Sequence, residues 1–366
     1  MVKKDRLVDL FLELVKIDSV SKEEQKVAER LIKELKLLGL AVKQDSKGNI
    51  IAQLKGNLLS GKTILFNAHM DTVSPGKNVN PVIKDGKIMS DGKTVLGADD
   101  KAGIAIIIEM LRILKEQQLL HGDIKVIFTV EEEIGLKGAK ELNKKDVTAD
   151  YCFVLDADGE VGTIVNRSPF QESINVIIKG KPAHAGICPQ KGISAIKIAA
   201  KAISQMKLGR IDMETTANIG VIKGGVATNI IPEEVVIEGE ARSHSVTKLK
   251  KQADHMIAKF NKAAQEAKGA VDIKIERAYD SVSIPISSPI IKLTKKVADK
   301  LGFKHKVVSS GGGSDASVIH SCGIPTIAIG IGMENVHSKN EYIKIKNLHE
   351  TAKYVLGVIR ETNNNW

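Results

Sequence analysis

The alternation of helical and strand patterns constrains the fold more than any other feature of this sequence. Helical patterns cover Asp5–Lys16, Lys22–Leu38 and the segment "KAGIAIIIEMLRILKEQQ", and apolar strand patterns occur in "NIIAQLKG", "KTILFNAH", "DIKVIFTV" and "YCFVLD". Apolar strands that alternate with helices are typical of a largely parallel sheet covered on both faces. The first part of the chain, up to about Pro169, is therefore predicted to be α/β.

The pattern changes between about residues 170 and 283. Strand and helix patterns there follow the order β-α-β-β-α-β, which is that of a split ferredoxin-like motif. The α/β pattern then resumes with "SPIIKLTKKVADKLG", "PTIAIGIG" and "NLHETAKYVLGVIRE". A chain of 366 residues is also long for one core. We predict a discontinuous, mostly parallel-sheet domain of residues 1–169 and 284–366, interrupted by an inserted α+β domain of residues 170–283.

Composition narrows the class of protein. The formal net charge is +10, but the lysines are scattered along helical faces without a basic run that aromatic residues interrupt, so nucleic acid is not an expected partner. The three cysteines are far apart and lack the spacing of a disulfide framework or a thiolate zinc site. The amphipathic N-terminus is not a signal peptide, and no window is apolar enough to span a bilayer. We expect a soluble cytoplasmic protein that does not bind membranes.

Potential metal ligands follow the strands of the outer domain. The carboxyl ends of parallel strands meet at one edge of a sheet, where ligands bind. Carboxylates gathered at that edge would repel one another, and cations are a suitable compensating partner. The acids and histidines at these positions are His69, Asp71, Asp99, Asp100, Glu131, Glu132, Glu133, Asp156, Asp158 and His337.

These residue types indicate a particular metal chemistry. Imidazole and carboxylate without thiolate suit zinc, with manganese or cobalt as alternatives. Two histidines and three carboxylates exceed the needs of one tetrahedral zinc, and they suit two metals about 3.5–4 Å apart with a bridging carboxylate. In "EEE", one glutamate could bind metal while its neighbour takes a proton from water. The alternative for that run is a solvated acidic turn.

The ordered set of motifs resembles a known family. "NAHMDTVSPG", "LGADDKAGIA", "TVEEEIGLKGA", "VLDADG", "KPAHAG", "GGGSDAS" and "NVHSKNEY" together look like the di-zinc peptidases. That family includes peptidase T, glutamate carboxypeptidase, and the acetylornithine and succinyl-diaminopimelate deacylases. The resemblance covers nearly the whole chain, and "HMDTVSPG" and "GADDKAG" are most similar to peptidase T and its relatives.

The resemblance implies ligands for two zinc ions. His69 and Asp156 would bind the first zinc, Glu133 and His337 would bind the second, and Asp99 would bridge both. The peptide bond after the bridging aspartate is often cis in this family.

Further roles near the metals follow from the same resemblance. Asp71 would orient the first histidine through a hydrogen bond. Glu132 would be the general base, a register fixed from Gly135 because the family pattern is base, ligand, any residue, glycine. Asp158 competes with Asp156 as a ligand because "DAD" departs from the simpler aspartate-glycine form.

The inserted domain carries candidates for substrate binding. His184 resembles the family histidine that stabilises the oxyanion, although without the resemblance a surface loop histidine is the simpler interpretation. Asn229 and Arg242 resemble substrate-contacting positions, and a strand-end salt bridge is the alternative for Arg242. Gly313 would let backbone approach the substrate, and Ser314 or Asp315 would cap the next helix.

The expected function is metal-dependent hydrolysis of an amide bond. The leading interpretation is an aminopeptidase that cuts short peptides, in which Glu132 activates a water between two metal ions. The alternatives are an N-acyl amino acid deacylase or dipeptidase of the same family, and, from another class, an inactive metal-binding protein or a nucleic-acid-binding protein. In relatives the inserted domain often makes a dimer, so a homodimer through a lid and dimerisation domain is also an expectation.

Overall fold

The computed structural model describes residues 2–363, which divide into two compact units. Unit 1 combines the chain up to Arg167 with Val282–Ser310 and the chain from Ser314 onward. Unit 2 comprises Ser168–Ser281 and the short segment Gly311–Gly313. Unit 2 therefore interrupts unit 1 in sequence, and each unit is described by itself below.

A nine-stranded sheet forms the centre of unit 1. Its order is β1-β2-β6-β3-β7-β16-β8-β14, and β15 pairs with β8. The four central strands β6, β3, β7 and β16 run parallel, whereas the β1–β2, β2–β6 and β16–β8 pairs are antiparallel. The strands are β1 (Ala41–Gln44), β2 (Ile50–Leu54), β3 (Ile64–His69), β6 (Ile124–Thr129), β7 (Tyr151–Ala157), β8 (Thr163–Ser168), β14 (Val282–Ser283), β15 (Lys306–Ser309) and β16 (Thr326–Gly330).

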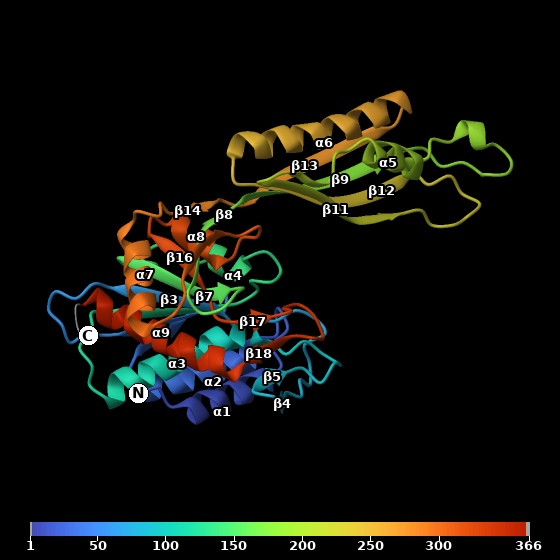
Figure 1. Cartoon of the computed structure of the whole chain (residues 1–366). Helices are drawn as coiled ribbons and strands as arrows, with labels where there is room; N and C mark the ends of the chain where they lie inside the picture. Colours follow the sequence, from blue (N-terminus) through green and yellow to red (C-terminus); the bar gives the residue numbers. More distant parts are fainter. Residues whose placement is uncertain (1, 364–366) are drawn as a thin grey trace. The chain divides into compact units, whose positions relative to one another are not determined.

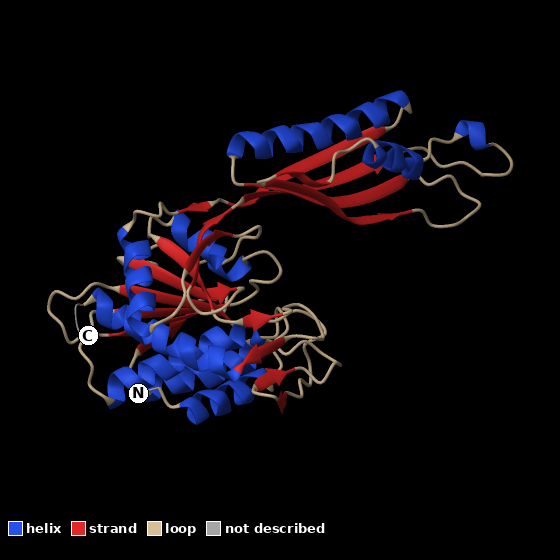
Figure 2. Cartoon of the chain, in the orientation of Figure 1, coloured by secondary structure: helices blue, strands red, loops and turns tan. Residues whose placement is uncertain are grey.

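Helices cover both faces of this sheet, as Figures 1 and 2 show. On one side α3 packs against β3 and β7, with α1 and α9 against it, and on the other side α8 packs against β7 and β16. The helices of unit 1 are α1 (Lys4–Val15), α2 (Gln25–Leu37), α3 (Ala98–Glu116), α4 (Lys137–Lys140), α7 (Pro289–Leu301), α8 (Asp315–Ser321) and α9 (Ile345–Thr362). None of the helices among residues 2–363 combines the length and apolar character that crossing a membrane requires.

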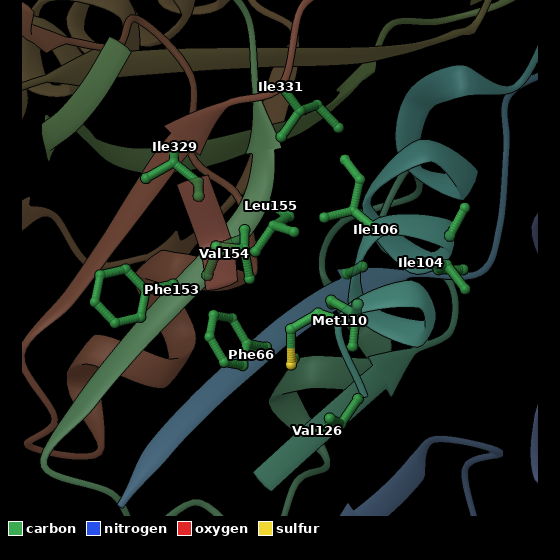
Figure 3. Packing of buried hydrophobic residues seen from close by; sticks show 14 of the residues in the cluster. Phe66, Ile104, Ile106, Met110, Val126, Phe153, Val154, Leu155, Ile329 and Ile331 are labelled. Carbon is green, nitrogen blue, oxygen red and sulfur yellow. The ribbon is translucent and has the colours of Figure 1, made fainter. Parts of the chain in front are cut away.

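The core of unit 1 explains why its strands lack an apolar–polar alternation. Every residue of β3 is buried because helices cover both faces of the strand. Phe66 stacks on its cross-strand partner Phe153 with ring centroids 5.8 Å apart. Figure 3 shows these rings packed in one cluster with Met110 and Ile106 of α3. The isoleucine-rich α3 is buried nearly all round, as its sequence predicts.

A small antiparallel sheet lies beside the main one in unit 1, in the order β17-β18-β5-β4. Its strands are β4 (Val82–Lys84), β5 (Lys87–Met89), β17 (Met333–Glu334) and β18 (Tyr342–Lys344). The loop between β17 and β18 carries His337 and Glu341. These two- and three-residue strands have no periodic pattern in the sequence, and the sequence analysis did not predict them.

Unit 2 is an antiparallel sheet with two helices on one face. The strand order is β10-β11-β12-β9-β13, and α5 and α6 pack against each other and against the sheet. The predicted β-α-β-β-α-β order is present, with β10 as an additional strand that was not predicted. The elements are β9 (Phe170–Lys179), η1 (Pro189–Lys191), α5 (Ala195–Ser204), β10 (Gly209–Asp212), β11 (Thr215–Gly224), β12 (Glu234–Ser243), α6 (Val246–Glu266) and β13 (Ala270–Tyr279).

Candidate metal centre

The parallel strands deliver the candidate ligands to one edge of the unit 1 sheet. β3 lies between β6 and β7, and His69, the last residue of β3, is in register with Thr129 at the end of β6. The glutamate run begins at Glu131, two residues after the end of β6, and Asp156 is the last residue but one of β7. The strand order therefore puts His69 between the glutamates and Asp156.

Asp99 lies between two imidazoles. Its Oδ1 is 2.9 Å from Nε2 of His69, and its Oδ2 is 3.0 Å from Nε2 of His337. The same His337 nitrogen is 2.9 Å from Oε1 of Glu133. One carboxylate thus faces a different histidine with each oxygen, which is the arrangement that a bridging ligand requires.

Two sets of ligand atoms are close enough to hold an ion. The atoms of His69, Asp99 and Glu133 lie within 4.8 Å of one another, and so do those of His69, Asp100 and Asp156. Both oxygens of Asp100 already accept hydrogen bonds, from the backbone N–H of His69 and of Gly103 at 3.2 Å each. Asp100 therefore caps the regular part of α3, and Asp156, with Oδ1 3.9 Å from Nε2 of His69, has the freer carboxylate.

Asp71 ties the first histidine to the glutamate run. Its side-chain oxygens accept hydrogen bonds from the backbone N–H groups of Glu132 and Glu133, at 2.9 and 3.2 Å, and from the hydroxyl of Ser21 at 2.7 Å. Nδ1 of His69 lies 2.9 Å from the backbone carbonyl oxygen of Asp71 and 3.4 Å from its Oδ1. The fully buried Asp71 therefore helps to orient both the His69 imidazole and the backbone of Glu132 and Glu133.

Glu341 holds the loop that carries Asp99. One of its oxygens accepts from the backbone N–H groups of Leu96 and Gly97, at 2.7 and 2.9 Å, and the other accepts from that of Asp99 at 3.1 Å. Gly97 has a φ of 75°, a left-handed conformation that glycine adopts without strain. The peptide bond that follows Asp99, Asp99–Asp100, is cis, as the resemblance implies.

The three consecutive glutamates have different environments. Glu131 forms ion pairs with Lys47 and Lys137, and its backbone N–H donates to the buried Glu24. Glu133 contacts His337, as described above. Glu132 is partly exposed, and burial of its carboxyl group together with the charge of Asp315 raises its pKa, although His69 opposes the shift. A raised pKa is characteristic of a carboxylate that exchanges protons during a reaction.

The clustered carboxylates shift the pKa values of the histidines among them. Hydrogen bonds to Asp99 and Glu133 raise the pKa of His337 to about 10. Burial opposes the charge of His69, but hydrogen bonds to Asp71 and Asp99 outweigh it and raise its pKa. Burial also opposes ionisation of Asp99, yet its two imidazole partners lower its pKa. The residues form a site for positive charge, and the imidazole and carboxylate donors suit a divalent ion such as zinc.

Comparison with known proteins agrees with this geometry. The family model described as peptidase family M20/M25/M40 matches residues 65–361, which is most of the chain. The chain belongs to this family.

Several known proteins are similar to this chain over almost their full length. The protein YqjE of Bacillus subtilis is 46% identical, with 99% of each chain covered. The structure of aminopeptidase PepT from Bacillus cereus is 45% identical with a TM-score of 0.88, and 99% of each chain is covered. A tripeptidase from Staphylococcus aureus is 43% identical with a TM-score of 0.94, and 100% of each chain is covered.

The remaining candidates belong to unit 2 or to its boundary. His184 and Asn229 are neighbours, because the backbone N–H of Ala185 donates to the carbonyl of Asn229 at 2.9 Å. Arg242 donates two hydrogen bonds to Glu240, at 2.8 and 2.9 Å, which is the strand salt bridge considered as an alternative. Its substrate role, like those of His184 and Asn229, stays a prediction.

Tyr279 and the N-cap of α8 hold the end of the glycine-rich segment "GGGSDAS". The backbone N–H of Gly313 donates to the hydroxyl of Tyr279 at 2.9 Å, and a Cβ at this position would lie 2.3 Å from the ring. Glycine is therefore required there for packing. Ser314 is the N-cap of α8, and its hydroxyl accepts from the backbone N–H of Ala316 at 3.3 Å.

Several residues that support the candidate site were not predicted from the sequence. Glu341 stands in the motif "NVHSKNEY" without a predicted role, and Ser21 and Glu24 belong to none of the motifs. Asp315 was considered as a cap, but its buried carboxylate accepts from Asn67 at 3.4 Å and pairs with Thr129 at the end of β6. These side chains form hydrogen bonds with backbone amides or with other side chains that surround the proposed ligands. The only sequence signal among them was an acid that stands within or beside one of the motifs.

We expect metal uptake by this protein to release protons. A pKa of about 10 means that the His337 imidazole is positively charged, with both ring nitrogens protonated, below that pH. A metal ligand must be a neutral imidazole with one bare nitrogen. Binding of Zn²⁺ at pH 7.5 should therefore expel about one proton from His337, and the apparent affinity should rise with pH until the proton is lost near pH 10. Calorimetry in buffers of different ionisation enthalpy measures the number released. The variant His337→Gln should release about one proton fewer; equal release by both proteins would contradict the assignment.

Proposed function

We propose that the protein is a metal-dependent aminopeptidase that acts on short peptides. The observation that carries the proposal is Asp99, whose two oxygens face the imidazoles of His69 and His337. The similarity to an aminopeptidase PepT and a tripeptidase, at 45% and 43% identity over nearly whole chains, supports the substrate class.

Two divalent ions would share the bridging carboxylate. His69, Asp99 and Asp156 would hold one ion, and His337, Glu133 and Asp99 would hold the other. The separations of 2.9–3.9 Å among their donor atoms support this division, and the engaged oxygens of Asp100 support Asp99 as the bridge. Zinc suits the nitrogen and oxygen donors best, with cobalt or manganese as alternatives. When bound, such a pair acidifies a water and polarises the substrate carbonyl.

Glu132 would act as general base and then general acid. Its backbone is held by Asp71, while the structure gives its carboxylate no hydrogen bond to another described side chain. It would accept a proton from the attacking water and pass it to the departing amine. The raised pKa of this carboxyl group makes it a better proton acceptor than an ordinary glutamate.

Unit 2 would serve as a lid and as a dimerisation domain. His184 would stabilise the oxyanion, and Asn229, Arg242, Gly313 and Ser314 would contact the substrate. β13 supports the dimer, because it lies at an edge of the unit 2 sheet and most of its residues are exposed. An exposed edge strand offers unpaired N–H and C=O groups to the same strand of a second copy. Analytical ultracentrifugation would show whether the protein is a dimer in solution. A cytoplasmic location stays a prediction.

The closest alternative is an N-acyl amino acid deacylase or dipeptidase of the same family, because those enzymes would use the same metal ligands. An inactive metal-binding protein would be marked by a missing ligand or base, and the sequence contains every residue proposed for these roles. A nucleic-acid-binding role would rest on net charge alone.

The substrate class is tested by a panel of unblocked di- and tripeptides and N-acetyl amino acids. The purified protein should cleave the tripeptides and release the N-terminal residue, because similar chains are an aminopeptidase and a tripeptidase. A chelator should abolish the activity, and Zn²⁺, Co²⁺ or Mn²⁺ should restore it. Cleavage of only the N-acetyl amino acids would favour the deacylase.

The role of Glu132 is tested by Glu132→Ala and Glu132→Gln. Both should lower kcat by at least about 10²-fold, since a general base contributes about 10²–10⁴. Metal content, measured by elemental analysis, should stay at the wild-type level. Glu131→Gln is the matched control, because Glu131 pairs with lysines, and it should keep most of the turnover. A Glu132→Ala enzyme with most of its rate would exclude this base.

A further inference from the structure

The loop that carries His184 is anchored on both sides in unit 2. Backbone bridges join Lys181 to Ile193 and His184 to Ile230. The N–H of Ile231 donates to the carbonyl of Ala183 at 2.9 Å, next to the Ala185–Asn229 hydrogen bond. The histidine therefore projects from a pinned backbone, although its side chain is exposed.

The backbone folds back toward the imidazole immediately after His184. The N–H of Gly186 and the N–H of Ile187 both point at Nδ1 of His184, each at 3.2 Å. The N–H of Cys188 donates to the carbonyl of the same histidine at 3.1 Å, which closes the turn before η1. Three consecutive amides thus converge on one residue, and two of them converge on one ring nitrogen.

This arrangement decides which ring nitrogen carries the hydrogen. In a neutral imidazole one nitrogen donates and the other accepts. A hydrogen on Nδ1 would meet the hydrogens of both amides, whereas the lone pair of a bare Nδ1 accepts from them. The two partners of Nδ1 therefore fix the tautomer, because the hydrogen bonds made by one ring nitrogen decide whether the other carries the hydrogen.

We infer that the backbone amides of Gly186 and Ile187 lock His184 as the Nε2–H tautomer, and so make it a committed hydrogen-bond donor through Nε2. The donor role toward a substrate carbonyl rests on the proposed function, but the tautomer does not. Gly186 and Ile187 are positioning residues, because they act only through the imidazole. An oxyanion site needs a donor that is oriented before the charge develops, and the two amides supply that orientation.

The tautomer is measured directly by long-range ¹H–¹⁵N correlation spectra of the full chain labelled at histidine nitrogen. The chain has nine histidines, and the signals that disappear in His184→Ala identify His184. At pH 7.5 we expect a bare Nδ1 and a protonated Nε2. A protonated Nδ1 with a bare Nε2, or rapid exchange between both forms, would overturn the inference.

A matched pair of variants tests the cause of the tautomer. Gly186→Pro removes one amide hydrogen, and the His184 signals should shift toward a mixture of both tautomers. Gly186→Ala keeps the amide, and its Cβ would meet the ring at an ordinary 3.7–3.8 Å, so its spectrum should keep the wild-type tautomer. The same pure Nε2–H form in a folded Gly186→Pro would refute the role of that amide. If Gly186→Pro does not fold, the wild-type spectrum still decides the tautomer.

Kinetics test what the donor does. Glutamine places an amide N–H near the position of Nε2, whereas asparagine reaches only the position of Nδ1. Loss of an oxyanion donor costs about 10²–10³-fold in kcat, so His184→Asn and His184→Ala should both fall by that factor, and His184→Gln should recover roughly tenfold of it. Equal losses in all three variants would exclude donation through Nε2. If no peptide is cleaved while the spectrum shows Nε2–H, the proposed function fails and the tautomer stands.

Discussion

The chemistry proposed for this molecule depends on the contact of one carboxylate, that of Asp99, with two imidazoles. Asp99 is almost completely buried, and so are His69 and Asp71, while further acids converge from the neighbouring strands. Like charges in such a place repel strongly unless positive charge is shared among them. The raised pKa values of His69 and His337 favour protons as that charge, and the proposed divalent ions would take their place. The strand order, the caps and the supporting hydrogen bonds all hold these charges together.

Much of the precision of the site comes from carboxylates that do not face the proposed ions. Asp71 binds the amides of Glu132 and Glu133, and Glu341 binds those of Leu96, Gly97 and Asp99. Each acid thus fixes a loop by satisfying several backbone donors at once. His184 in unit 2 shows the reverse arrangement, because backbone amides fix a side chain. In both cases the main chain determines where a functional group points.

The sequence predicts the α/β pattern and the ligand types because apolar strands and their terminal acids are local signals. The individual roles came from the ordered motifs, since strand ends alone do not separate Asp99 from Asp100. The hydrogen bonds that Asp71 and Glu341 accept from backbone amides could not be predicted, because they depend on where distant parts of the main chain lie. The strands β4, β5, β17 and β18 were not predicted either, because two or three residues are too few to show an alternation of apolar and polar side chains. The Arg242–Glu240 pair was within reach, because residues two apart share a face of a strand.

The insertion of unit 2 has a consequence for how the chain is made. β16 lies between β7 and β8, yet it follows them by more than a hundred residues, so the main sheet keeps a gap until nearly the whole polypeptide has left the ribosome. Unit 2 is almost continuous and can fold while synthesis proceeds. His337 emerges later still, after β16. A nascent chain therefore holds only part of the proposed ligand set, and the set becomes complete only at the end of synthesis.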